Sequence, residues 1–257
     1  MIFILFVELD AFTQLSGLLA VLAISITWMY GFIVLFKAIK QKNKVLIYFF
    51  IAIIFTMAPW YPSGLGYIYW LITHEEIAYP VYVVLGTIGT PIALLAWLQI
   101  YMPALHKNQK GIATWIIIGL TIVFYIYTFI FLFIAPGAPI QGMIGFKRSA
   151  IDIDYKGFVL VFLAFSLLVS TITGNDFSIA SLKIKDNPVT KWKGRFLLLS
   201  FNFFAIGAIG DGFLPLTPAT LIIFRLFMML SSTFYYLGFM LPKWLRKLLK
   251  LEEEEHN

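Results

Sequence analysis

Two residues of opposite charge stand in a strongly apolar part of the sequence, and they are the first candidates for chemistry. Asp211 and Arg225 both lie within the segment IGDGFLPLTPATLIIFRLFMMLSSTFYY. An arginine at the centre of a membrane helix costs about 2.5–3.5 kcal/mol or more, because hydrocarbon does not solvate its charge. We therefore expect Arg225 to face a protein interior and to pair with Asp211.

Helix geometry brings the two side chains within reach of each other. Thr217 and Pro218 form a helix start, since threonine is a good N-cap and proline is favoured at the first helical position. Arg225 then lies roughly 10 Å along the helix, at about 1.5 Å per residue, and its long side chain can reach back toward Asp211. The pair either only locks two helices together or lines a pocket for a small polar or anionic molecule or a lipid headgroup.

Three further polar side chains extend this candidate site. Ser232 and Tyr236 share one helical stripe with Arg225. Gln14 stands near the start of the first apolar run, and it would complete a polar cluster if the first and last helices are neighbours. We therefore expect Asp211, Arg225, Ser232, Tyr236 and Gln14 to form the site.

The composition indicates the kind of fold that holds these residues in place. Hydrophobic residues make up 61% of the 257 and charged residues 12%, whereas about 25% are charged in soluble domains. Apolar runs long enough to cross a bilayer recur along the chain. The sequence predicts an all-α, polytopic protein of the cell membrane with seven transmembrane helices. The predicted helices cover residues 11–36, 45–60, 79–102, 112–135, 157–173, 196–210 and 218–241.

The basic residues set the predicted orientation, because loops rich in Lys and Arg stay on the cytoplasmic side. Most of the 19 lie in four segments that fall on one side of the predicted bundle, namely 37–44, 107–110, 183–195 and 243–250. The N-terminus is therefore predicted outside and the C-terminus inside. The net charge of +6 then reflects loop placement, so we expect the lipid bilayer as a partner and no nucleic acid.

Prolines predict where the second and third helices are kinked or interrupted. Pro59 and Pro62 should break or kink the second helix, because proline lacks a backbone donor. The segment 64–72 after them is either an interfacial helix, which could act as a lid, or a continuation of the second helix beyond a kink. Pro91 should kink the third helix, where Gly86 and Thr90 form a small-residue pair that lets another helix approach closely. We treat all three prolines as hinges.

The end of the chain predicts a membrane anchor. Residues 1–241 form the predicted transmembrane domain, and residues 242–257 form a cytoplasmic amphipathic helix with an acidic tail. Trp244 is expected on the apolar face of this helix, and Arg246, Lys247 and Lys250 are expected to contact anionic headgroups.

Several classes of function are excluded or not expected. The chain has no cysteine, which excludes disulfides and thiol chemistry. No lysine lies within a predicted span, so a retinal Schiff base is excluded. His74, His106 and His256 are scattered, and no hydrolase, zinc or nucleotide motif is present. We expect neither enzymatic activity nor a metal or cofactor.

The final third carries a resemblance to a known family. The motifs GAIGD, LPLTP and LSSTFYYLGFMLPKWLRKLL are similar in order and type to the end of the seven-helix membrane sensor domain at the N-terminus of prokaryotic histidine kinases. The resemblance implies a sensor that binds a small molecule or lipid near the outer ends of its helices. Because no kinase domain follows, it implies a stand-alone module that signals to a cytoplasmic protein through segments 183–195 and 242–251. A small-molecule or lipid transporter and a structural subunit of a membrane complex remain as alternatives.

Overall fold

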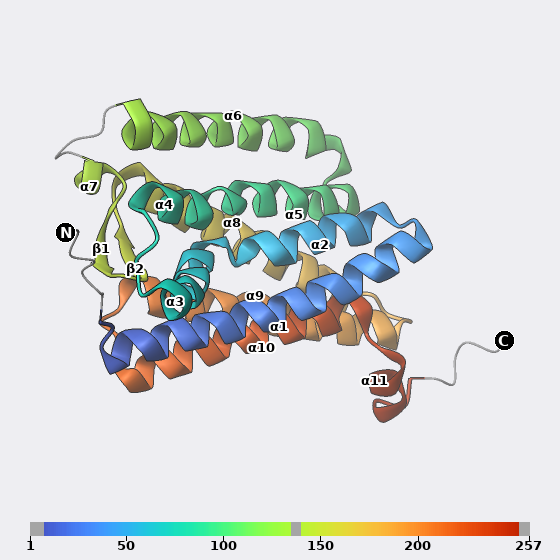
Figure 1. The fold of residues 1–257 in the computed structure, drawn as a ribbon. Coiled ribbons are helices and arrows are strands. Elements are labelled where there is room, and N and C mark those ends of the chain that lie inside the picture. Colours follow the sequence, from blue (N-terminus) through green and yellow to red (C-terminus); the bar gives the residue numbers. More distant parts are fainter. Residues whose placement is uncertain (1–7, 135–139, 252–257) are drawn as a thin grey trace, which may run out of the picture.

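The computed structural model describes residues 8–134 and 140–251, and its long helices run side by side in one bundle (Figure 1). The principal helices are α1 (Ala11–Gln41), α2 (Lys44–Thr56), α3 (Tyr61–Thr73), α4 (Tyr79–Thr87), α5 (Gly89–Leu105), α6 (Lys110–Phe129), α8 (Gly157–Leu182), α9 (Pro188–Phe213) and α10 (Pro218–Met240). The shorter helical elements are η1 (Ala58–Trp60), η2 (Lys107–Gln109), the π-helical turn η3 (Ile130–Ile134), α7 (Ile140–Met143) and α11 (Lys243–Leu248).

Seven helical segments within the described ranges are long and apolar enough to cross a membrane. They are Ala11–Gln41, Lys44–Thr73, Tyr79–Leu105, Lys107–Ile134, Gly157–Leu182, Pro188–Phe213 and Pro218–Met240. The predicted number and order of spans are confirmed, and the architecture is that of a multi-pass membrane protein. Because the number is odd, α1 begins at one end of the bundle and α10 finishes at the other (Figure 1).

The fold is predominantly helical, as predicted, and a short β-hairpin is added to it. Strand β1 (Gly145–Ser149) pairs antiparallel with β2 (Asp152–Tyr155). Tyr82 of α4 fixes the hairpin by donating a hydrogen bond of 2.9 Å to the carbonyl oxygen of Ile151. We call the end of the bundle that carries β1 and β2 the hairpin end, and the opposite end, where α1 meets α2 and α11 follows α10, the basic end (Figure 1).

The predicted helices 157–173 and 196–210 are too short. Polar residues follow Thr173, but α8 continues because those side chains find partners between helices. Asn202 of α9 donates to Asn175 at 2.8 Å, and Tyr101 of α5 donates to Asp176 at 2.8 Å. Helix α9 begins early because Asn187 caps it. The predicted basic loop 183–195 therefore shrinks to a turn, and its second half forms the first turns of α9.

The second span contains the predicted break, and it continues beyond that break. Helix α2 ends at Thr56, η1 follows, and α3 starts at Tyr61 with Pro62 in its first turn, where a missing N–H leaves no hydrogen bond unmade. The segment 64–72 is thus the second half of the span and not a separate interfacial helix. In the third span the interruption falls at Ile88, between α4 and α5, and Pro91 lies in the first turn of α5. The predicted hinge movement at Pro59, Pro62 and Pro91 stays a prediction.

Helices α9 and α10 approach closely because the residues between them are small. A Cβ atom on Gly207 would lie 2.7 Å from the Cγ atom of Met228. Ser200 and Ser231 each donate a hydrogen bond of 2.9 Å to the other's backbone carbonyl oxygen. This packing brings the last turn of α9 beside the second and third turns of α10.

Candidate functional site

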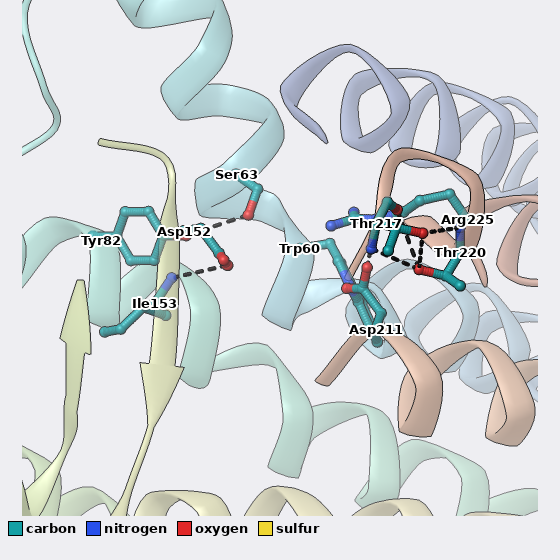
Figure 2. Close-up of polar contacts among 9 residues, drawn as sticks. All are labelled: Trp60, Ser63, Tyr82, Asp152, Ile153, Asp211, Thr217, Thr220 and Arg225. Atoms are coloured by element: carbon teal, nitrogen blue, oxygen red, sulfur yellow. Dashed lines mark hydrogen bonds and ion pairs between the residues drawn. The ribbon is translucent and has the colours of Figure 1, made fainter. Parts of the chain in front are cut away.

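Asp211 and Arg225 form a buried ion pair. The Nε atom of Arg225 lies 3.0 Å from Oδ1 of Asp211, and their side chains are only 3% and 9% exposed. The second carboxylate oxygen, Oδ2, accepts a hydrogen bond of 2.5 Å from the indole nitrogen of Trp60 (Figure 2). The predicted pairing is confirmed, and Trp60 is an additional partner that the sequence did not indicate.

The start of α10 sets the depth of Arg225. Thr217 and Thr220 form a capping box, in which each threonine hydroxyl accepts from the other residue's backbone N–H (Figure 2). Such a cap satisfies donors that the first helical turn leaves unpaired. The helix is therefore anchored at Thr217, and Arg225 faces the bundle interior two turns further along.

A cavity with a volume of about 150 Å³ lies at the hairpin end, with Asp211 and Arg225 in its wall. Its lining comes from the end of α2, η1, α3, α4, α5, both strands, α8, α9 and α10. The break in the second span contributes Thr56, Trp60 and Ser63. Because Pro59 and Pro62 redirect the chain at this point, the break places these side chains in the wall of the cavity.

Four buried polar side-chain atoms have no hydrogen-bond partner among the described residues, and all four belong to residues that line this cavity. They are Oγ1 of Thr90, Oη of Tyr155, Oγ of Ser166 and Nη1 of Arg225. Buried polar atoms in proteins are almost always hydrogen-bonded, and an unsatisfied one costs about 1–3 kcal/mol. Four side chains with unmatched hydrogen-bonding capacity therefore stand in the wall of one cavity.

The hairpin supplies the other charges of the cavity. Asp154 pairs with Arg148 at 3.3 Å and with Lys156 at 2.7 Å. Within the described part of the chain, Asp152 has no cation within 4.0 Å, and its Oδ1 accepts only from the backbone N–H of Ile153, at 3.0 Å. Burial raises the pKa of Asp152 to about 6, and the negative charge of Asp211 adds to this, against the opposing effects of the Arg148 and Arg225 charges. The Asp152 carboxylate faces the side on which Trp60 and Asp211 lie (Figure 2).

A glycine on α4 makes room for the hairpin. A methyl group on Gly86 would overlap the Oη atom of Tyr155, and it would lie 3.1 Å from the Cγ atom of Pro62. The predicted close approach at Gly86 is therefore real, but a tyrosine of β2 fills most of the space, together with α3. Gly86 thus leaves room for the Tyr155 hydroxyl against α4.

Two predicted site residues on α10 lie away from this cavity. Ser232 is buried and forms a hydrogen bond of 2.8 Å with Thr27 of α1. It lines a second, smaller cavity of about 40 Å³ that shares Thr56, Ala93, Ser170 and Phe204 with the first. Tyr236 stacks on Tyr30 with ring centroids 4.7 Å apart and lines neither cavity. Both share the stripe of Arg225, but each further turn of α10 carries them about 5 Å away from the hairpin end.

The prediction for Gln14 is wrong. Its side chain is exposed, and its Nε2 atom donates to the carbonyl oxygen of Leu9 at 2.8 Å. Helices α1 and α10 are neighbours as supposed, but the rotation of α1 turns Thr13 inward, 7% exposed, and Gln14 outward.

The predicted membrane anchor is only partly as expected. Leu245 of α11 is buried, whereas Trp244 is 61% and Leu248 72% exposed. The Nε atom of Arg246 donates to the carbonyl oxygen of Leu241 at 3.0 Å, so this arginine also caps the end of α10. Lys247 and Lys250 are exposed. The acidic tail beyond residue 251 lies outside the described residues, and contact with lipid stays a prediction.

Sequence reasoning missed Trp60, Asp152, Tyr155 and Ser166. Asp152 was visible only as one acid of a connecting segment, and no local pattern indicated that the segment folds back over the bundle. Comparisons with protein-family models, with curated proteins and with solved structures find no match for this chain.

Proposed function

We propose that this protein is a receptor-like membrane module that binds a small polar molecule in the cavity at the hairpin end. One observation carries the proposal, namely that four residues with a buried polar atom that has no partner among the described residues all line that cavity. Ligand sites combine a mostly apolar wall with a few convergent polar groups. The volume of about 150 Å³ suits a molecule much smaller than a drug, since cavities for drug-sized ligands measure about 300–1,000 Å³.

The distribution of charge supports an outward-facing cavity. Turns and helix ends rich in Lys and Arg gather at the basic end, which the positive-inside rule assigns to the cytoplasm. The hairpin end would then face the outside of the cell membrane. Arg148, which lines the cavity with its side chain 45% exposed, would lie at the entrance for a molecule that arrives from outside.

Helix α10 offers a direct route for a signal. It runs without interruption from the cap at Thr217, past Arg225, to Met240, and α11 follows at once. A ligand shifts such a helix only if it binds one of two arrangements more tightly. The exposed face of α11 and the turn between α8 and α9 would be the contacts for a cytoplasmic signalling protein. The resemblance to histidine-kinase sensor domains points to the same role.

Transport is the second candidate, and the smaller cavity favours it. That cavity continues from the first toward the middle of the bundle through their shared lining residues. It ends against Trp97, Phe201 and Tyr235, which are 2%, 7% and 9% exposed. A path through the bundle would require this aromatic cluster to move, so binding without passage agrees better with the packing.

A single-cysteine reporter tests the receptor proposal. Since the chain has no cysteine, a Leu248→Cys variant in lipid nanodiscs accepts one environment-sensitive fluorophore on α11. We expect a saturable change in its emission on titration with at least one of four small probes: ethanolamine, glycine, glycolate and ethylene glycol. Ser166→Ala should weaken the response, whereas Ser178→Ala, on the same helix but bonded to the carbonyl oxygen of Gly174 at 2.6 Å, should not.

Other outcomes would support the alternatives. Uptake of a probe into protein-containing vesicles, above that of empty vesicles, would favour the transporter. The absence of both a reporter response and uptake would contradict the receptor proposal and leave a structural subunit as the remaining interpretation.

A further inference from the structure

The hydrogen bonds and ion pairs in the cavity leave one acid unmatched. Asp211 uses Oδ1 for Arg225 and Oδ2 for Trp60. Asp154 uses Oδ1 for Arg148 and Oδ2 for Lys156. Asp152 receives only a backbone N–H, and no cation of the described residues lies within 4.0 Å of it. The cavity therefore holds one carboxylate with no cation in direct contact, and the charges of Arg148 and Arg225 act on it only from beyond 4.0 Å.

The same cavity contains a matching unsatisfied donor. Nη1 of Arg225 is buried without an acceptor, although Nε of the same guanidinium group is paired with Asp211. The aromatic side chains of Trp60, Tyr82 and Tyr155 form part of the wall. Aromatic rings favour cations through the negative potential of their faces. An acid, a donor and aromatic surfaces thus line one small space.

We propose that the cavity binds a small protonated amine that also carries an oxygen acceptor, with the ammonium group on Asp152 and the oxygen on Nη1 of Arg225. The inference rests on the proposed function and names the chemical class of its ligand. Amino alcohols and amino acids share this chemistry. They differ in whether the acceptor is a hydroxyl group or a carboxylate.

Simpler occupants satisfy only part of the site. A small anion would meet Nη1 of Arg225 but would also face the unpaired carboxylate of Asp152. An inorganic cation would neutralise Asp152 but leave Nη1 without an acceptor. Water could bond to the hydroxyl groups, yet it would not compensate the charge of Asp152. A molecule with both groups satisfies the acid and the donor together.

The electrostatics of the hairpin agree with an ammonium partner. The raised pKa of Asp152 follows from burial and from the charge of Asp211, so its place in the cavity wall disfavours the carboxylate form. A neighbouring cation favours that form. A bound ammonium group would therefore bring the pKa of Asp152 back toward its ordinary value, and the amine would gain affinity wherever Asp152 is already ionised.

Binding of four molecules of similar size tests the proposal. Ethanolamine carries a cation and a hydroxyl group, glycine is a zwitterion, glycolate is an anion and ethylene glycol is neutral. We expect ligand-observed NMR titration of the protein in nanodiscs to show that ethanolamine, glycine or both bind at least about tenfold more tightly than the other two, as for a charge-assisted contact. Asp152→Asn should remove this preference. Glu75→Gln, which makes the same charge change at an exposed carboxylate outside the cavity, should alter binding less than about twofold.

A second measurement does not depend on the Asp152 variant being folded. In a Ser166→Cys variant, the cationic aminoethyl methanethiosulfonate should modify the cavity thiol faster than the anionic sulfonatoethyl reagent, after correction for their rates with a free thiol. Equal corrected rates, or tighter binding of glycolate or ethylene glycol than of both amines, would overturn the amine proposal. The receptor proposal would survive that result if the neutral methyl reagent still reached the cavity thiol, and it would fail as well if this reagent did not.

Discussion

Trp60 donates its indole N–H to Asp211 across 2.5 Å, and this contact ties the break in the second span to the ion pair between α9 and α10. Asp211 thereby has both oxygens engaged, one by Trp60 and one by Arg225. The pair is therefore not an isolated lock between two helices. It connects three spans at the wall of a cavity, which gives a shift of α10 a route to the rest of the bundle.

Exchange of the two charges should not restore stability. Arg225→Leu leaves Asp211 buried without its cation and should lower the free energy of unfolding by about 3–5 kcal/mol, as for other broken buried pairs. The double variant Asp211→Arg/Arg225→Asp restores opposite charges, but its new arginine would face the donor N–H of Trp60. We expect thermal unfolding in detergent to show only partial recovery, and full recovery would contradict the role assigned to Trp60.

Gly86→Ala should displace the hairpin. The added methyl group overlaps Oη of Tyr155, and overpacking of this kind costs about 1–3 kcal/mol. Gly119→Ala makes the same change on α6 where nothing lies within 4 Å, and it should be neutral or stabilise by up to about 1 kcal/mol. Thermal unfolding measures both. Tyr155→Phe removes the overlapping oxygen, so it should recover part of the loss in the Gly86→Ala variant.

The stability of the ligand-free protein should fall with rising pH because of Asp152. Its pKa is raised from 3.8 to about 6 on folding, so the unfolded chain loses this proton first. Ionisation therefore favours the unfolded state between about pH 4 and pH 6, and the effect is complete above that window. Asp152→Asn should raise the melting temperature at pH 7.5 and leave it nearly unchanged at pH 4. An equal rise at both pH values would show that the substitution acts through packing.

The affinity for an amine should rise with pH because of Asp152, whereas the stability of the ligand-free protein should fall. Below pH about 6, Asp152 takes up a proton and loses its attraction for an ammonium group. Ethanolamine should thus bind about tenfold more weakly at pH 5 than at pH 7.5, since one pH unit below a pKa leaves about a tenth of the acid ionised. NMR titration across this range measures the change. In the Asp152→Asn variant the weakened affinity should not vary with pH.

The elements of this fold differ in how far the sequence predicts them. The Asp211–Arg225 pair was predictable because a buried arginine requires a partner and the connection between the two helices is short. The contact of Trp60 was not, since prolines indicate that a helix breaks but not the direction it then takes. Asp152 depends on a hairpin held by Tyr82 and by an ion pair between Lys147 and Glu76, which are contacts between distant segments.

The errors in helix length and helix rotation have a common cause. Polar residues such as Asn175 lower the local hydropathy, yet α8 continues because Asn202 satisfies that side chain. Gln14 and Thr13 are adjacent polar residues, and only the packing of α1 decides which of them turns inward. Contacts with other helices determine where α8 ends and how α1 is rotated. The sequence of one segment alone does not show which residues of other helices it will contact.

We propose that the cavity at the hairpin end is a binding site open to the outside of the membrane. Modification of a Ser166→Cys variant by a small neutral methanethiosulfonate reagent tests it most directly, in protein reconstituted in vesicles with the hairpin end outward. A parallel Ser178→Cys variant, buried on the same helix outside both cavities, is the control. The account predicts that externally added reagent modifies the thiol at position 166 much faster than the thiol at position 178, and that a bound amine slows the reaction. Equal reactivity of the two variants, or no reaction at position 166, would contradict it.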